Sequence, residues 1–152
     1  MVGAGERLAS LIELTKRSRL TKSVFFTGKI PLHEVPCYIN SSDICFALFD
    51  RNYRPFQLFG YYYSPIKLHE YKSCGKAVIA SDYPQLRELV KNGINGYTVD
   101  ETNISALQHS IQYLLQRPSL LKKISSYNRR EVLQRYTWDH FNRTILDKVF
   151  KP

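Results

Sequence analysis

The stretch SPIKLHEYKSCGKAVIASD, residues 64–82, carries most of the information about the fold of this chain. It begins with a Ser-Pro pair, which is typical of a helix start because proline has no amide hydrogen to leave unpaired in the first turn. Lys67 and Glu70 fall on one side of that helix. Gly75 ends the helix, and the apolar run 77–80 follows at once. We therefore predict a short helix set tightly against a buried strand.

Other short apolar runs lie on both sides of this stretch. Residues 24–26, 44–48 and 77–80 show no alternation of apolar and polar side chains, which is typical of strands covered on both faces. Residues 97–99 form a weaker fourth candidate. The expected helices contain residues 8–15, 31–40, 65–74, 84–91, 104–114, 118 onward and 138–150. This alternation predicts an α/β fold, with a Rossmann-like parallel sheet and flanking helices.

The composition indicates a globular chain with enough apolar residues for a core. Of its 152 residues, 43% are hydrophobic and 23% are charged, which excludes a disordered chain. No apolar run is long enough to span a bilayer. Cys37, Cys45 and Cys74 show no metal-binding spacing with one another or with histidine, so we expect free thiols, a reducing compartment and no metal.

The net charge of +9 points to an anionic partner. Basic residues gather late in the chain, opposed over that span only by Glu131; they are Arg117, Lys122, Lys123, Arg129, Arg130 and Arg135. Such a surface attracts nucleic acid, anionic lipid or phosphorylated small molecules, and charge alone does not choose between them. A solvated helix face with nothing bound is an equal alternative.

Ligands of open parallel sheets bind beyond the carboxyl ends of the strands. That rule marks residues 28–30, 50–63 and 81–82, and the helix of the opening stretch begins at the end of the second of these segments. Several aromatic residues and two arginines crowd that segment, where they either contact a ligand or pack the loop. The sequence therefore places the helix start at the candidate site.

The helix start has the groups that a nucleotide sugar requires. With Ser64 as the cap and Pro65 as the first helical residue, the amides of Ile66 and Lys67 are free to bind phosphate. A carboxylate such as Glu70 accepts hydrogen bonds from two vicinal hydroxyls. On spacing alone the alternative stays open that Lys67 and Glu70 form an exposed ion pair and that Ser-Pro merely starts a helix.

The longer stretch SPIKLHEYKSCGKAVIASDYPQLRELVKNGINGYTVD, residues 64–100, resembles the signature segment of the group-1 glycosyltransferases, which are retaining enzymes with the GT-B fold. The order of helix, Gly-Lys, Val-Ile strand, Ser-Asp, Glu-bearing helix and Asn-Gly is nearly that of the family. The segments VFFTGKIPLHEVPCYINSSDICFALF, residues 24–49, and RYTWDHF, residues 135–141, also resemble it. The resemblance covers essentially the whole chain.

The resemblance implies where a nucleotide-sugar donor binds. Glu70 matches the second glutamate of the family's Glu-x7-Glu motif and would hold the ribose, while Tyr62 stands in place of the first glutamate. Residues 64–67 match the turn and helix start that meet the diphosphate, and residues 28–30 match the loop beside the base. The expected donor-binding residues are Glu70, Ser64, Pro65, Ile66, Lys67, Gly28, Lys29 and Ile30, and no catalytic residue is assigned.

The resemblance is confined to the later part of the C-terminal, donor-binding domain. The N-terminal acceptor domain, the first strand of the donor domain and most or all of the second have no counterpart in residues 1–152. In the family's strand order these two strands lie between residues 24–26 and 44–48. We therefore expect the chain alone to be marginally stable, to self-associate or to pair its strands unusually. We also expect it to transfer no sugar by itself.

For the intact enzyme, the resemblance implies transfer of a hexose from a UDP- or GDP-linked sugar to a glycan, lipid-linked or other acceptor, with retained configuration and no metal. Polysaccharide biosynthesis is the expected setting. The basic surface fits a cytoplasmic enzyme in peripheral contact with the inner face of a membrane.

Two other classes of function are compatible with an α/β chain of this composition. A non-catalytic remnant, or a partner subunit that completes its fold with another chain, is the alternative. A nucleic-acid-binding module is disfavoured, because the basic residues lie on the late helices and no nucleic-acid motif is present.

Overall fold

The structure, a computed structural model, describes residues 1–60 and 65–150. It divides into an N-terminal unit, Met1–Tyr38, and a C-terminal unit, Ile39–Pro152, each of which is described by itself. Among the described residues, no helix is both long and apolar enough to cross a membrane.

The N-terminal unit contains helix α1 and the first residues of a second helix, and no ladder of paired strands among its residues. Helix α1 (Leu8–Arg17) confirms the helix expected there. The prediction of a strand at residues 24–26 is wrong, because these residues form no strand and the bridge beyond them, Gly3–Gly28, is isolated. An apolar run becomes a strand only where a partner continues the hydrogen-bond ladder. Here the Thr27 amide donates to the Met1 carbonyl and the Gly3 amide donates to the Gly28 carbonyl, and the ladder does not continue.

Residues 31–40 form two short helices in place of the single one expected. A 3-10 turn, η1 (Leu32–Glu34), is followed by α2 (Val35–Asn40). Pro31 precedes the turn in an extended conformation, with ψ of 144°, so it is not the first helical residue.

The C-terminal unit is built on a parallel three-stranded sheet. Its strands β1 (Ile44–Ala47), β2 (Ala77–Ser81) and β3 (Gly96–Val99) confirm three of the four expected strands. They are ordered β1-β2-β3, and both pairs are parallel. Parallel pairing brings the carboxyl ends of all three strands to one end of the sheet.

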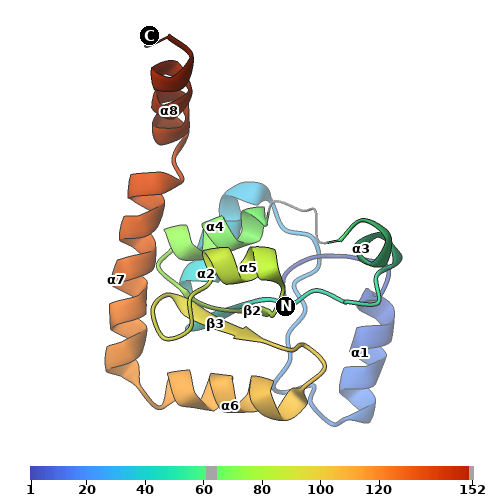
Figure 1. Ribbon diagram of the computed structural model, residues 1–152. Helices are drawn as coiled ribbons and strands as arrows, with labels where there is room; N and C mark the ends of the chain where they lie inside the picture. The colour runs from blue at the N-terminus through green and yellow to red at the C-terminus, as the bar shows by residue number, and fades with distance from the viewer. Residues whose placement is uncertain (61–64, 151–152) are drawn as a thin grey trace. The chain divides into compact units, whose positions relative to one another are not determined.

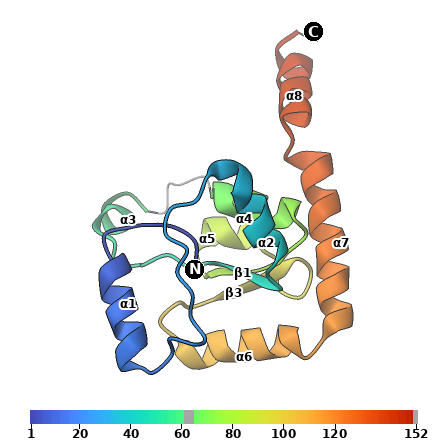
Figure 2. The same ribbon diagram turned by 180° about the vertical axis from the view of Figure 1, so that it is seen from behind.

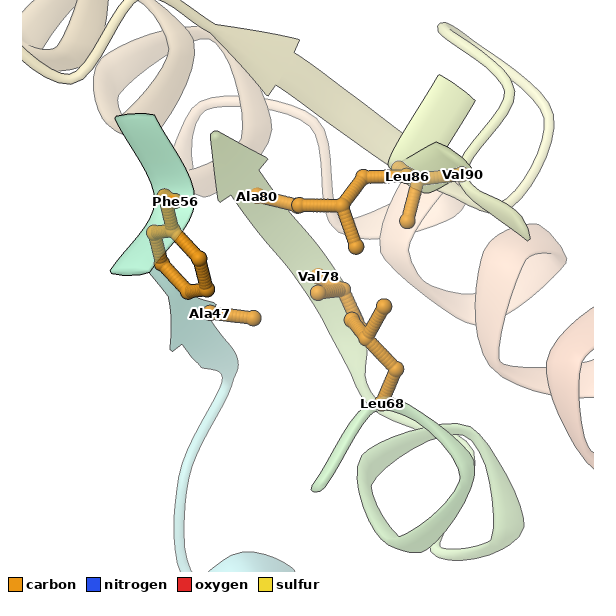
Figure 3. Close-up of a cluster of buried hydrophobic side chains, with 7 residues drawn as sticks. All are labelled: Ala47, Phe56, Leu68, Val78, Ala80, Leu86 and Val90. Atoms are coloured by element: carbon orange, nitrogen blue, oxygen red, sulfur yellow. The ribbon is translucent and has the colours of Figure 1, made fainter. Parts of the chain in front are cut away.

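Helices cover both faces of this sheet, as the unbroken apolar runs predicted. All five residues of β2 are buried. On one face, Val78 and Ala80 pack with Leu68 and Leu86 in a single cluster, whose side chains converge in Figure 3. On the other face, Ala77 and Ile79 pack in a second cluster. Figure 1, and Figure 2 from behind, show α4 and α5 on one side of the sheet and α6 on the other.

Five helices of the C-terminal unit follow the expected order: α4 (Ile66–Ser73), α5 (Pro84–Leu89), α6 (Ile104–Leu115), α7 (Pro118–Arg135) and α8 (Trp138–Phe150). Helix α3 (Arg54–Phe59) is not among the expected helices, because the sequence predicts a loop over residues 50–63. Helix α4 is followed by Gly75, whose φ of +68° is a left-handed conformation that favours glycine. A Cβ atom there would also lie 2.7 Å from the Ser125 hydroxyl oxygen of α7.

A buried ion pair joins α4 to α7. The Lys72 side chain is 1% exposed, and its Nζ lies 2.5 Å from Oε2 of Glu131, whose side chain is 13% exposed. Lys72 also donates to the carbonyl of Leu89. Asn95 donates to the same Glu131 carboxylate. The helix that carries the candidate site is therefore held by a satisfied polar cluster as well as by Leu68.

Lys72→Met should lower the free energy of unfolding by about 3 kcal/mol, because it leaves the Glu131 charge buried without its cation. Unfolding in urea measures this loss. The double variant K72M/E131Q is the matched control, since it removes both charges and keeps an acceptor for Asn95. It should regain most of the lost stability. Equal losses in the two variants would show that packing, rather than an uncompensated charge, explains the effect.

Candidate functional site

The first turn of α4 lies at the carboxyl end of the sheet, and its Ile66 and Lys67 amides have no hydrogen-bond partner among the described residues. Pro65 is the N-cap residue, with φ of −81° and ψ of 75°, and Ile66 is the first helical residue, so the expectation that Pro65 begins the helix was wrong by one position. The Pro65 carbonyl accepts from the Leu68 amide at 2.8 Å. No side chain of the described residues caps this helix start. Its amides are therefore available to an anion.

Lys67 points toward the end of β1. Its Nζ lies 5.0 Å from the ring centroid of Phe49, two residues beyond the strand. The alternative that Lys67 pairs with Glu70 is not found among the described residues, since neither side chain has an ion pair there. Lys67 therefore keeps its charge free at the carboxyl end of the sheet.

Glu70 lies one turn further along α4 and is half-buried. Within the described part of the chain its carboxylate accepts no hydrogen bond. Its backbone carbonyl is engaged, accepting from the Ser73 hydroxyl at 2.7 Å and from the Cys74 amide. The backbone of Glu70 is thus fixed, while its carboxylate is free to accept from a hydroxylated ligand.

Four of the eight expected donor-binding residues are brought together, and the others are placed elsewhere or not described. Pro65, Ile66, Lys67 and Glu70 share one and a half turns of the chain. Ser64 lies outside the described residues, as does Tyr62. The remaining three, Gly28, Lys29 and Ile30, belong to the N-terminal unit. There Gly28 has φ of +68° and its carbonyl accepts from the Gly3 amide at 2.9 Å.

A cluster of charged residues at the carboxyl ends of β1 and β3 was missed by the sequence analysis. Arg51 donates from Nε to Glu101 at 2.8 Å and from Nη2 to Asp100 at 2.8 Å. The Tyr83 hydroxyl donates to the same Glu101 oxygen at 3.3 Å. Nothing in the local sequence signals this contact, because its partners are about 50 residues apart. The cluster ties the segment after β1 to the segment after β3.

The Glu101 side chain is only 10% exposed, which governs its titration. Burial alone would raise the pKa of Glu101, but the hydrogen bond from Arg51 and the charge of that guanidinium outweigh it and hold the pKa below its usual value. The second carboxylate oxygen is buried and has no hydrogen-bond partner among the described residues. The Arg51 guanidinium therefore favours the ionised form of Glu101 despite the burial of this side chain.

Two of the aromatic residues that precede α4, Tyr53 and Phe56, pack against each other, whereas Phe59 is exposed. Phe56 of α3 is 9% exposed and belongs to the core cluster above the sheet. Tyr53 lies edge-to-face on Phe56, with ring centroids 5.1 Å apart. The packing alternative thus holds for these two residues, whereas Tyr61, Tyr62 and Tyr63 lie outside the described residues.

A cavity of about 450 Å³ lies on another flank of α4, where the sequence predicted nothing. His69 lines it, with its ring tilted by 45° against that of Tyr136 and ring centroids 4.6 Å apart. Burial, and then the charge of Lys72, lower the pKa of His69, so its ring is neutral near pH 7. The cavity is lined by Ile66, His69, Arg135, Tyr136, Thr137, Trp138, His140, Phe141 and Thr144.

The cysteines and histidines form no metal-binding cluster in the part of the chain that the structure describes. Cys45 is buried, and burial raises the pKa of its thiol. Cys74 is half-buried and Cys37 is exposed, so only one of the three thiols is fully enclosed.

Comparison with known proteins decides the family. The family described as "Glycosyl transferases group 1" matches residues 1–131. The chain belongs to this family. The resemblance noted in the sequence is thereby confirmed, and the α/β fold of the C-terminal unit is that of the C-terminal domain of GT-B glycosyltransferases.

Several relatives of this group-1 glycosyltransferase chain share that fold or sequence. An uncharacterized glycosyltransferase of Methanocaldococcus jannaschii, MJ1069, is 25% identical over 145 residues, which cover 91% of this chain and 33% of the relative. Anabaena Alr3699/HepE, solved with UDP-glucose, matches with a TM-score of 0.77 and 22% identity, covering 97% of this chain and 39% of that one.

A third comparison concerns a separate domain. The C-terminal domain of the group-1 protein LpcC from Francisella tularensis matches with a TM-score of 0.66 and 20% identity, covering 89% of this chain and 66% of that domain's chain. This chain spans about a third of the length of its curated relative from Methanocaldococcus jannaschii.

Arg51→Ala should raise the pKa of Glu101, since burial then acts on the carboxyl without the opposing cation. In the wild-type protein the lowered pKa means that this ionised carboxylate contributes stability above its unfolded pKa. That contribution is lost as the pH falls through the folded pKa. Carbon-13 NMR of the glutamate carboxyl groups measures the shift, with Arg54→Ala as the neighbouring control. An unchanged Glu101 titration in R51A would contradict the assignment.

Proposed function

We propose that the chain is the donor-binding part of a glycosyltransferase that moves a sugar from a nucleoside-diphosphate sugar to an acceptor. The observation that carries this proposal is the arrangement of α4: uncapped amides and Lys67 at the carboxyl end of the sheet, with an unpaired Glu70 one turn away. An anion and a pair of hydroxyls are the two parts of a nucleoside diphosphate that such groups recognise.

The chemistry follows from these residues. The amides of Ile66 and Lys67 and the Lys67 ammonium would meet the diphosphate, and Glu70 would accept from the ribose hydroxyls. Negative charge grows on the diphosphate as the sugar departs, so these groups would stabilise the leaving group electrostatically. We expect no metal requirement on that ground. Gly28, Lys29 and Ile30 would line the base, and Ser64 would join the helix start.

The comparisons support a uridine nucleotide as the first donor to test, because HepE was solved with UDP and with UDP-glucose. Retention of configuration and a glycan or lipid-linked acceptor stay proposals. Because the chain covers about a third of its curated relative, transfer is assigned to a longer protein, and the 152 residues alone are expected not to transfer sugar. No observation favours a non-catalytic remnant or partner subunit, which stays the alternative.

Glu70→Ala should weaken binding of UDP by about tenfold or more, because the ribose hydroxyls lose a charged acceptor. Calorimetric titration of UDP into the protein as its gene encodes it measures this. Glu88→Ala is the matched control, since Glu88 is an exposed glutamate of the next helix, α5. Equal UDP affinity in E70A and the wild type would refute the ribose role. Transfer assays with EDTA test the absence of a metal requirement.

A cytoplasmic enzyme in peripheral contact with a membrane is the second part of the proposal. Lys122, Lys123 and Arg130 of α7 are exposed and have no acidic partner among the described residues. The one glutamate of α7, Glu131, forms an ion pair with Lys72. The exposed face of α7 is therefore positively charged without compensation, which favours an anionic lipid surface at roughly 1 kcal/mol per basic residue.

The variant K122Q/K123Q/R130Q should bind vesicles of phosphatidylcholine and phosphatidylserine more weakly than the wild type. Added salt should reduce the difference, because the attraction is screened. Co-sedimentation with the vesicles measures binding. The control K16Q/R19Q/K22Q removes the same charge from exposed positions of the N-terminal unit. Equal losses in the two variants would show a general effect of net charge instead of a docking face.

A further inference from the structure

We infer that Phe49 is a positioning residue for Lys67, holding its ammonium group where the diphosphate of the donor arrives. The inference rests on the proposed donor role of the start of α4 and adds a residue to it. The ring of Phe49 lies 5.0 Å from Lys67 Nζ, within the range of a cation–π interaction. Phe49 is not itself in contact with the reacting atoms in this scheme; it acts through Lys67.

Hydrogen bonds to the last residue of β2 fix the backbone of Phe49. The Phe49 amide donates to the Ser81 hydroxyl oxygen at 2.8 Å, and that hydroxyl donates back to the Phe49 carbonyl at 3.3 Å. Ser81 is the last residue of β2 and is fully buried. The Phe49 ring also lies edge-on to Phe56 of α3, with centroids 6.3 Å apart. Phe49 is thus held by two neighbouring elements.

An aromatic ring suits this task better than a carboxylate would. A carboxylate beside Lys67 would neutralise the ammonium and compete with phosphate for its hydrogen bonds. The face of a ring attracts the cation without accepting a strong hydrogen bond, so its N–H groups stay available. No acidic side chain of the described residues pairs with Lys67.

Ordering Lys67 in advance lowers the entropic cost of binding. A free lysine side chain loses much of its rotamer freedom when a ligand immobilises it. Lys67 is exposed, and no hydrogen bond within the described residues restrains its ammonium. The contact with Phe49 restricts the side chain before the ligand arrives, which is preorganisation.

A double-mutant cycle on the protein as its gene encodes it tests this, with UDP as the ligand and calorimetry as the measurement. Phe49→Leu keeps an apolar side chain but removes the ring, and should weaken UDP binding about two- to fivefold, as expected for an exposed cation–π contact. Phe49→Tyr keeps the ring and should bind UDP as the wild type does. Lys67→Met should weaken binding more than F49L. F49L/K67M should be no weaker than K67M alone.

Uridine, which lacks phosphate, separates positioning from damage to the fold. F49L should bind uridine as tightly as the wild type, because the effect passes through Lys67 to the diphosphate. Weaker uridine binding in F49L, or losses in F49L and K67M that add, would overturn the positioning role and leave the donor site intact. UDP binding that is unchanged in K67M would instead refute the proposed role of Lys67 itself.

Discussion

The burial of β2 on both faces is the constraint on which the rest of the C-terminal unit depends. All five residues of β2 are enclosed, with alternate side chains in the two core clusters. Parallel neighbours then require each connecting helix to return from the carboxyl end of one strand to the amino end of the next. Helix α4 must therefore begin beside the end of β1. Its free amides reach the ligand-binding end of the sheet as a consequence of topology.

Polar contacts then fix α4 against α7. The Asn128 amide donates to the carbonyls of Lys76 and Asn95, both at 2.9 Å. Arg129 donates to the Ser73 carbonyl at the end of α4. Together with the Lys72–Glu131 pair, these bonds hold the helix from its second turn to the loop beyond it. A helix start that binds an anion gains from this rigidity, because little order remains to be acquired when the ligand arrives.

The sequence predicted what depends on local pattern and missed what depends on distant contacts. The strands around Val78 and Tyr97 and the helices α4 to α8 follow from apolar periodicity and from proline and glycine positions. The strand at residues 24–26 failed, since a strand needs a partner that the run itself does not specify. The contacts of Lys67 with Phe49 and of Arg51 with Glu101 join segments with no shared motif. The start of α4 was predicted one residue early because Pro65 fits either position.

The charges at the carboxyl end of the sheet are arranged unequally, and this bears on how an anion would lie there. Arg51 is matched by two carboxylates, Asp100 and Glu101, so the end of β3 has a net negative charge. Among the described residues, Lys67 on the α4 side contacts an aromatic ring and no carboxylate. The end of β3 would repel a diphosphate, and the start of α4 would attract it through both its amides and its ammonium. In the proposed binding mode, Glu70, deeper along α4, would accept from the uncharged ribose hydroxyls, so one helix would bind the two parts of a nucleoside diphosphate with groups of different charge.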